Sequence, residues 1–204
     1  MTDIYVVRHG NTFDKGDVVT RVGARTDLSL SQSGRDQVAA LATHFAENVP
    51  QGFSAAYCSP LRRTRETAEA ILAKSSTAPE LTAVEFLREV DYGPDENRPE
   101  TEVIQRVGEA ALQAWESKAV PPPGWEIEPE EVRAAWSDFL SKLSRRKSDR
   151  PVLIVTSNGI ARFVLDVIEN DGARPEAIKL KTGAYGMIEN APERPVLRSW
   201  NVRP

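Results

Sequence analysis

Short apolar runs alternate with amphipathic stretches along most of the chain. The runs at residues 4–7 and 152–155 lack polar alternation, which is typical of strands buried on both faces of a sheet. Less regular segments predict further strands at residues 53–58, 83–87, 185–189 and 196–200. Because strands alternate with helical stretches, we expect an α/β fold. Its form is a three-layer sandwich, with a mainly parallel sheet flanked by helices on both faces.

Helices are predicted where apolar residues recur every three or four positions. Ser31 or Ser33 caps the first of them, and Pro60 and Pro129 fit the first turns of two others. Two more are expected at residues 102–118 and 159–169. The proline run at residues 121–123 is interpreted as a stiff connector, because amphipathic sequence resumes directly after it. The chain is therefore expected to form one domain over residues 1–204, with a cap-like helical insertion at about 94–128.

Composition narrows the class of protein. The chain of 204 residues is 40% hydrophobic and has a net charge of -4, which argues against a nucleic-acid binder. Its single cysteine, Cys58, excludes an intramolecular disulfide and a thiolate metal cluster. No basic leader and no apolar run of membrane-spanning length is present. We expect a cytoplasmic protein without membrane contact, and the sequence does not fix its oligomeric state.

Three polar segments follow predicted strands, at residues 8–10, 59–63 and 156–159. Ligands of such sheets collect beyond the carboxyl ends of the strands. The first segment places an arginine beside a histidine. A guanidinium matches phosphate oxygens, and a neutral imidazole is a competent nucleophile toward phosphorus. Taken alone, Arg8 and His9 fit equally well a buried, hydrogen-bonded pair with a structural role.

Several motifs in the same order resemble one family. Residues 8–12, Arg-His-Gly-Asn-Thr, are similar to the Arg-His-Gly-x-Thr signature of the histidine phosphatase superfamily, which includes the cofactor-dependent phosphoglycerate mutases. Residues 25–34 resemble the family's Thr-Asp-x-x-Leu-Ser/Thr-x-x-Gly stretch, and residues 59–68 resemble the segment with its second phosphate-binding arginine. Residues 87–93 resemble the segment that carries a proton-donating glutamate. The ordered set spans nearly the whole chain.

The resemblance implies a role for individual residues. His9 is expected to attack the phosphoryl group and become a phosphohistidine, while Arg8 and Arg63 hold the non-bridging oxygens. Within the motif the second arginine is Arg63, because Arg62 falls on a variable position. Glu89 is expected to protonate the leaving oxygen and later to activate water. The alternative for Glu89 is a plain surface carboxylate.

Lys15 and Tyr92 fall where the mutase branch contacts substrate, and the alternatives are a solvated lysine and a core tyrosine. No cluster of metal-ligating residues is seen in the sequence, so neither a metal nor another cofactor is expected. The expected partner is a small phosphorylated substrate.

One position departs from the family pattern. The family carries a second histidine after the late strand, and this chain has Ser157 there. His44 lies within a predicted helix and is not expected to replace it. Ser157 and Asn158 either supply neutral hydrogen bonds to the phosphoryl group or cap the next helix. Losing one preorganised donor costs on the order of a hundredfold to a thousandfold in rate.

Three functions follow from these observations. The leading hypothesis is a phosphatase that acts on a small phosphorylated metabolite through a phosphohistidine on His9. The first alternative is a catalytically weak or inactive member of the same fold that binds a phosphoryl ligand. The second is a phosphoglycerate mutase. It is less favoured because mutases usually have a longer insertion with additional basic residues, whereas the span of residues 89–150 is shorter and includes an acidic segment at 126–131. The sequence does not identify the physiological substrate.

Overall fold

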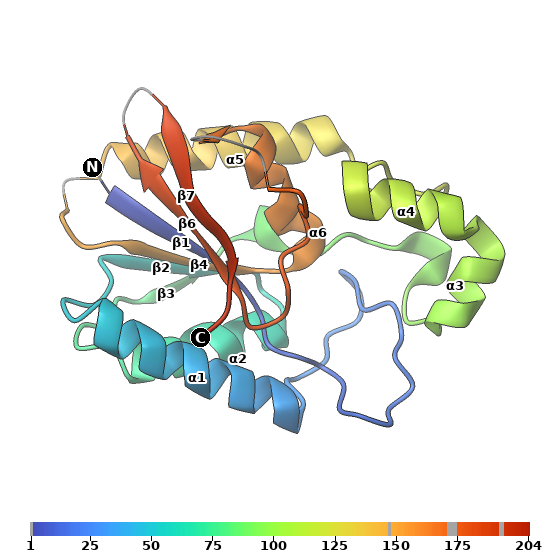
Figure 1. The fold of residues 1–204 in the computed structure, drawn as a ribbon, viewed down its shortest axis with the longest axis horizontal. Helices are drawn as coiled ribbons and strands as arrows, with labels where there is room; N and C mark the ends of the chain where they lie inside the picture. Colours follow the sequence, from blue (N-terminus) through green and yellow to red (C-terminus); the bar gives the residue numbers. More distant parts are fainter. Residues whose placement is uncertain (1, 147, 171–174, 192–193) are drawn as a thin grey trace.

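A seven-stranded sheet organises the chain (Figure 1), whose computed structural model describes residues 2–146, 148–170, 175–191 and 194–204. The strand order is β3-β2-β4-β1-β6-β7-β5. β1, β2, β3 and β4 run parallel to one another, and β6 is antiparallel to both β1 and β7. The strands are β1 (Thr2–Arg8), β2 (Ala55–Cys58), β3 (Leu81–Ala83), β4 (Val152–Thr156), β5 (Glu169–Asn170), β6 (Tyr185–Asn190) and β7 (Pro195–Val202).

Helices cover both faces of this sheet, which confirms the predicted three-layer architecture (Figure 1). One face carries α1 (Gln32–Asn48) and α2 (Arg62–Ala73). The other carries α5 (Pro129–Ser144) and α6 (Asn158–Ala161), with a 3-10 segment at Arg162–Asp166. The helices α3 (Glu100–Val107) and α4 (Glu109–Lys118) stand to one side, beyond the carboxyl ends of β1 and β4.

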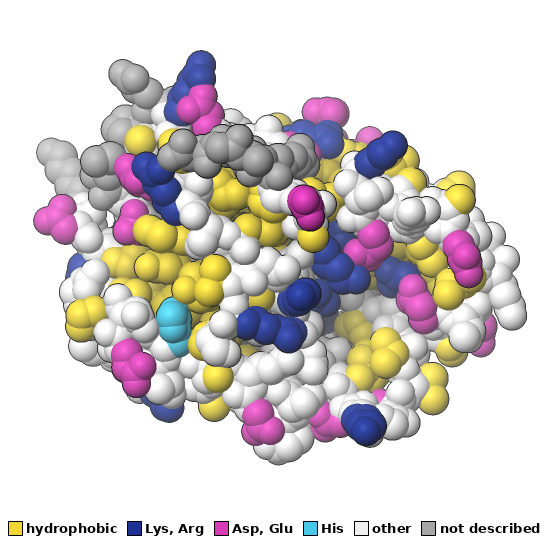
Figure 2. All heavy atoms as spheres, viewed as in Figure 1, with side chains coloured by type: hydrophobic (Ala, Val, Ile, Leu, Met, Phe, Trp, Pro, Cys, Tyr) yellow, Lys and Arg dark blue, Asp and Glu magenta, His cyan; other side chains and the backbone are white. Residues whose placement is uncertain are grey.

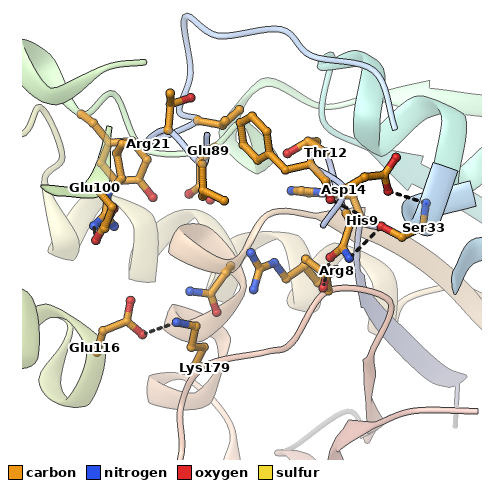
Figure 3. Close-up of a pocket in the computed structure, with 18 of the residues that line it drawn as sticks. Arg8, His9, Thr12, Asp14, Arg21, Ser33, Glu89, Glu100, Glu116 and Lys179 are labelled. Carbon is orange, nitrogen blue, oxygen red and sulfur yellow. Dashed lines mark hydrogen bonds and ion pairs between the residues drawn. The ribbon is translucent and has the colours of Figure 1, made fainter. Parts of the chain in front are cut away.

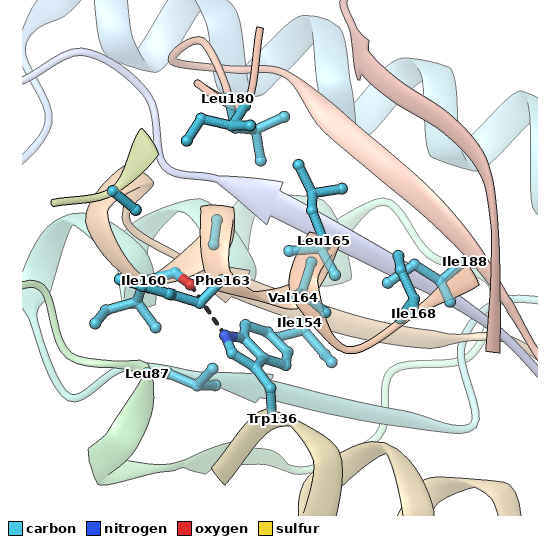
Figure 4. Close-up of a cluster of buried hydrophobic side chains, with 14 of the residues drawn as sticks. Leu87, Trp136, Ile154, Ile160, Phe163, Val164, Leu165, Ile168, Leu180 and Ile188 are labelled. Atoms are coloured by element: carbon cyan, nitrogen blue, oxygen red, sulfur yellow. Dashed lines mark hydrogen bonds between the residues drawn. The ribbon is translucent and has the colours of Figure 1, made fainter. Parts of the chain in front are cut away.

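An apolar cluster under α5 and α6 positions the segment that follows β4 (Figure 4). Trp136 of α5 is fully buried there, and its indole Nε1 donates a hydrogen bond of 3.0 Å to the carbonyl of Ile160 in α6. Ile160 and Phe163 belong to the same cluster. The start of α6, which directly follows Ser157, is therefore held against the sheet by buried apolar surface.

Three predicted elements differ from the structure. The strand predicted at residues 83–87 is wrong: β3 ends at Ala83, and Glu85–Leu87 forms a 3-10 turn that buries Leu87. The helix predicted at 102–118 is broken by Gly108, whose φ of 82° lies in a region that only glycine adopts readily. The helix predicted at 159–169 ends as an α-helix at Ala161.

The span of residues 94–128 contains α3 and α4. Val103 of α3 and Trp115 of α4 are buried in the same cluster as the apolar side chains of β1 and β4. The assignment of one domain with a cap-like insertion stays a prediction. Among the residues that the structure describes, no helix is both long enough and apolar enough to cross a membrane.

Candidate active site

The carboxyl ends of β1 and β4 bring two of the polar segments side by side. Arg8 pairs with Thr156 in the sheet, and the His9 amide donates to the Thr156 carbonyl at 3.2 Å. The third segment follows β2 and leads into α2, whose Arg63 Nε donates to His9 Nε2 at 3.2 Å. Because β2, β4 and β1 are parallel neighbours in the sheet, His9, Arg63 and Ser157 come together beyond the carboxyl ends of these strands.

The orientation of the His9 ring is set by hydrogen bonds at both nitrogens. Nδ1 donates to the Gly10 carbonyl at 2.7 Å, which leaves a lone pair on Nε2, the atom that accepts from Arg63. Burial lowers the pKa of His9 well below its usual value, and the neighbouring charges of Arg63 and Arg8 lower it further. The imidazole is therefore neutral at neutral pH. A neutral ring with an unprotonated Nε2 is the form that attacks phosphorus, and the Nε2 lone pair becomes available when it gives up the hydrogen bond from Arg63.

Two guanidinium groups flank this ring without a carboxylate partner. Arg63 is fully buried and donates to neutral acceptors, the carbonyls of Thr26 at 2.8 Å and Gly23 at 3.2 Å. Arg8 donates to the Leu180 carbonyl at 2.8 Å, and its buried Nε has no hydrogen-bond partner. Neither arginine forms an ion pair within the described part of the chain. Glu89 is a nearby carboxylate that acts on both charges without a direct ion pair. Since a buried cation without a direct partner is costly, the pair favours an anion beside His9.

Glu89 is held at the same site by hydrogen bonds from two backbone amides. The residue is 7% exposed, and its carboxylate accepts hydrogen bonds from the amide of Val90 at 2.9 Å and from the amide of Gly159 at 3.2 Å. A Cβ on Gly159 would lie 2.1 Å from Glu89 Oε1. Only glycine at this position lets the carboxylate reach α6. Glu89 is thus not a plain surface carboxylate, and it faces the cavity described next.

A cavity of about 650 Å³ opens in front of His9 (Figure 3). In the space-filling view, Lys and Arg side chains gather around a hollow between the sheet body and the side formed by α3 and α4 (Figure 2). The cavity is lined by six of the residues expected from the sequence, namely Arg8, His9, Lys15, Glu89, Tyr92 and Asn158. Arg63 and Ser157 are fully buried behind this lining.

The side chains of Ser157 and Asn158 differ in their hydrogen bonds. Ser157 precedes α6, but its hydroxyl makes no capping hydrogen bond, and the buried Oγ has no partner among the described residues. Asn158 Oδ1 accepts from the Leu180 amide at 2.8 Å, so the donor that Asn158 offers a ligand is Nδ2. The hydroxyl of Ser157 lies at the same sheet edge as His9, and the prediction that Ser157 replaces the second histidine of the family pattern stays a prediction.

The two substrate-contact candidates differ in exposure. Lys15 is exposed at the rim of the cavity. Tyr92 is buried, packs edge to face on Trp125 with ring centroids 4.5 Å apart, and has a pKa raised chiefly by burial. A substrate contact made by Tyr92 would therefore come from a tightly packed ring with a protonated hydroxyl.

Sequence reasoning missed most of the lining, including the charged residues Arg21, Glu100, Glu116 and Lys179. They lie on the wall formed by the loop after β1, α3, α4 and the segment before β6 (Figure 3). On the sequence each resembles an ordinary solvated charge. No signal in a single chain marks them, because only the placement of α3 and α4 turns them inward. Among the described residues, no group of three or more His, Cys, Asp and Glu is placed to hold a metal ion.

A doubly covered sheet with a neutral histidine between two arginines at the carboxyl ends of its strands defines an α/β protein with a basic, histidine-containing site. The Histidine phosphatase superfamily (branch 1) matches residues 4–203, and the chain belongs to that family.

Curated relatives carry a phosphatase name. The chain is 35% identical over 158 residues to the Fructose-2,6-bisphosphatase TIGAR of Mus musculus, covering 72% of this chain and 55% of that protein. It is 38% identical over 125 residues to the protein of the same name from Bos taurus, covering 59% and 43%. The chain thus spans about half the length of the curated relatives it matches.

Solved structures show the same fold. A mycobacterial glucosyl-3-phosphoglycerate phosphatase superposes with a TM-score of 0.80 at 20% identity, covering 100% of both chains. A phosphoserine phosphatase from Entamoeba histolytica gives a TM-score of 0.72 at 19% identity, covering 99% of this chain and 98% of that one.

Proposed function

We propose that this protein is a phosphoric monoester hydrolase that acts on a small phosphorylated metabolite through a phosphohistidine on His9. The observation that carries the proposal is the neutral His9 ring, held between two arginines that lack carboxylate partners. The phosphatase names of the curated relatives support it. The cytoplasm is the proposed location.

In the first half-reaction, the Nε2 lone pair of His9 forms a bond to phosphorus while the bond from phosphorus to the leaving oxygen breaks. Arg8 and Arg63 neutralise the charge on the non-bridging oxygens, and such preorganised donors supply much of the catalysis in phosphoryl transfer. Glu89, at the cavity wall, gives its proton to the leaving oxygen, which departs as an alcohol.

In the second half-reaction, water attacks the phosphohistidine. Glu89, now ionised, takes a proton from this water, and the bond from Nε2 to phosphorus breaks to release inorganic phosphate. His9 returns to its neutral form, with Nδ1 still donating to the Gly10 carbonyl. The cycle uses no redox step and consumes one water.

The test is a panel of small phosphomonoesters assayed with the purified protein. We expect release of inorganic phosphate, without need for a bisphosphoglycerate primer. Dependence on such a primer, together with transfer of phosphate between positions of glycerate, identifies a mutase instead. Tight binding of phosphate without turnover of any ester identifies the inactive alternative.

Glu89→Gln is expected to lower kcat on alkyl phosphates by about a hundredfold, within the range for general acid catalysis. Activated aryl phosphates need little protonation of the leaving oxygen, so their phosphorylation step should change far less. The two substrate types are compared by kcat/KM, because this parameter reports the first half-reaction. Gln keeps one acceptor oxygen, which serves the Val90 amide or the Gly159 amide but not both, so thermal unfolding of the variant is measured as the control. Equal losses on both substrate types indicate a binding role for Glu89.

Ser157→His is expected to raise turnover about tenfold, because it adds a cationic donor to the phosphoryl-binding edge. Binding should change little, since Arg8 and Arg63 already supply the ground-state attraction for a dianion. The readouts are kcat and inhibition by inorganic phosphate or vanadate, measured on the same preparation.

Packing is the concern with Ser157→His, because Ser157 is fully buried and overpacking costs stability. Thermal unfolding of the variant and Ser157→Asn, a smaller neutral donor, provide the controls. A well-folded histidine variant that binds the anion normally but gains no turnover contradicts the idea of a weakened site. Another group then already performs the work of the missing histidine.

A further inference from the structure

The cavity has two halves with different charge arrangements. Beside His9, Arg8 and Arg63 face neutral acceptors. On the opposite wall the cations are already paired with carboxylates (Figure 3). Arg21 forms an ion pair with Glu100, and Lys179 Nζ lies 3.1 Å from Glu116 Oε2.

Glu116 is the carboxylate of the second pair, and it lies close to two cations. It projects from α4, is 38% exposed at the side chain, and lines the cavity. Besides Lys179, it lies 4.0 Å from Nη2 of Arg162, a fully buried arginine. One carboxylate is thus shared by two cations.

Arg162 is fixed in place behind this wall. Its guanidinium lies 4.3 Å from the Trp115 ring centre, donates from Nη1 to the Trp115 carbonyl, and donates from Nε to the Asn158 carbonyl. These contacts hold its charge near Glu116. The far half therefore holds the Glu116 carboxylate between two cations, Arg162 and Lys179, and is not an open basic cluster.

This arrangement discriminates between leaving groups. Glu116 offsets the attraction that Lys179 and Arg162 would otherwise exert on a second phosphate at the far wall, because its carboxylate repels an anion placed within a few ångströms. A hydroxyl group meets no such cost. It donates to Glu116 and accepts from Lys179 at the same time, because a hydroxyl is both donor and acceptor.

We propose that Glu116 is a specificity-determining residue, which selects phosphomonoesters whose remainder carries neutral hydroxyl groups and disfavours those with a second phosphate. The inference deepens the proposed phosphatase function and rests on it. It assigns to α4 a part in substrate choice.

The experiment compares fructose 6-phosphate with fructose 1,6-bisphosphate, which share one carbon skeleton. We expect the protein to prefer the monophosphate by kcat/KM. Glu116→Gln should shift the ratio of kcat/KM for the bisphosphate over the monophosphate upward by about tenfold or more, since it frees Lys179 and Arg162 for an anion. Lys179→Gln should shift the ratio the other way.

The matched control is Glu130→Gln. Glu130 is an exposed glutamate that is paired with Arg133 and lies outside the cavity lining. This variant should leave the ratio unchanged. An unchanged ratio in Glu116→Gln, or a preference of the unmodified protein for the bisphosphate, overturns the inference. If Glu116→Gln does not fold, Lys179→Gln decides alone, because a ratio that does not fall contradicts the charge argument.

Failure of the proposed function is distinguished by binding. If no ester is hydrolysed, the phosphatase proposal fails, and calorimetry with inorganic phosphate and pyrophosphate still tests Glu116. We then expect Glu116→Gln to tighten pyrophosphate binding about tenfold more than phosphate binding. Equal changes for the two anions reject the role of Glu116.

Discussion

His9→Ala is expected to abolish phosphomonoester turnover, with a loss of about a thousandfold or more, because it removes the group that bonds to phosphorus. Phosphate affinity should largely persist, since Arg8 and Arg63 remain. The measurements are kcat and a rapid quench with labelled substrate. The unmodified protein should show an acid-labile phosphoprotein, and the variant should show none.

The second histidine of the chain provides the matched control. His44 lies in α1 and its Nε2 hydrogen bonds to the Tyr185 hydroxyl at 2.9 Å, away from the cavity lining. His44→Ala should keep both turnover and the labelled intermediate. Full activity in His9→Ala, or label that persists in it, contradicts the phosphohistidine mechanism.

Most of the fold was predictable because the pattern of apolar and polar residues reports burial directly. The runs in β1 and β4 are apolar at nearly every position, and both strands lie in the middle of the sheet. Short apolar runs are ambiguous, and residues 83–87 show why: Leu87 is buried from a 3-10 turn and not from a strand. Gly108 breaks one predicted helix into two, an outcome that helical spacing alone does not signal.

The near half of the site was also accessible from sequence. Arg8, His9 and Glu89 fall in motifs at the ends of local segments, and the structure places all three on the cavity wall. Their catalytic roles stay predictions. The far half was not accessible, because Glu116 and Lys179 come from segments far apart in the chain that meet only after α4 has packed. The electrostatic character of a pocket wall depends on such tertiary pairs, whereas the candidate nucleophile follows from a local motif.

Arg63→Lys is expected to lower kcat/KM by about a thousandfold, although it preserves the charge. The Arg63 guanidinium uses separate nitrogens for separate partners: Nε for His9, Nη1 for the Thr26 carbonyl and Nη2 for the Gly23 carbonyl. A lysine ammonium is a point charge and cannot keep this planar set while it also serves a phosphoryl oxygen. Loss of one preorganised donor accounts for about a hundredfold to a thousandfold, and misorientation of His9 adds to it.

Arg62→Lys is the matched control, because it makes the same substitution at the neighbouring position at the start of α2. Arg62 is the neighbouring residue of α2, with a side chain 62% exposed and 3.7 Å from Glu66. It should tolerate the same substitution with less than a twofold change in kcat/KM, since an exposed ion pair contributes little. Thermal unfolding shows whether each variant is folded, and inhibition by vanadate reports anion affinity. We expect Arg63→Lys to lose vanadate affinity together with kcat, because one guanidinium both binds the anion and holds the nucleophile. If Arg62→Lys proves the more damaging change, then the phosphate-binding arginine has been assigned to the wrong residue, and the site must be rebuilt around Arg62.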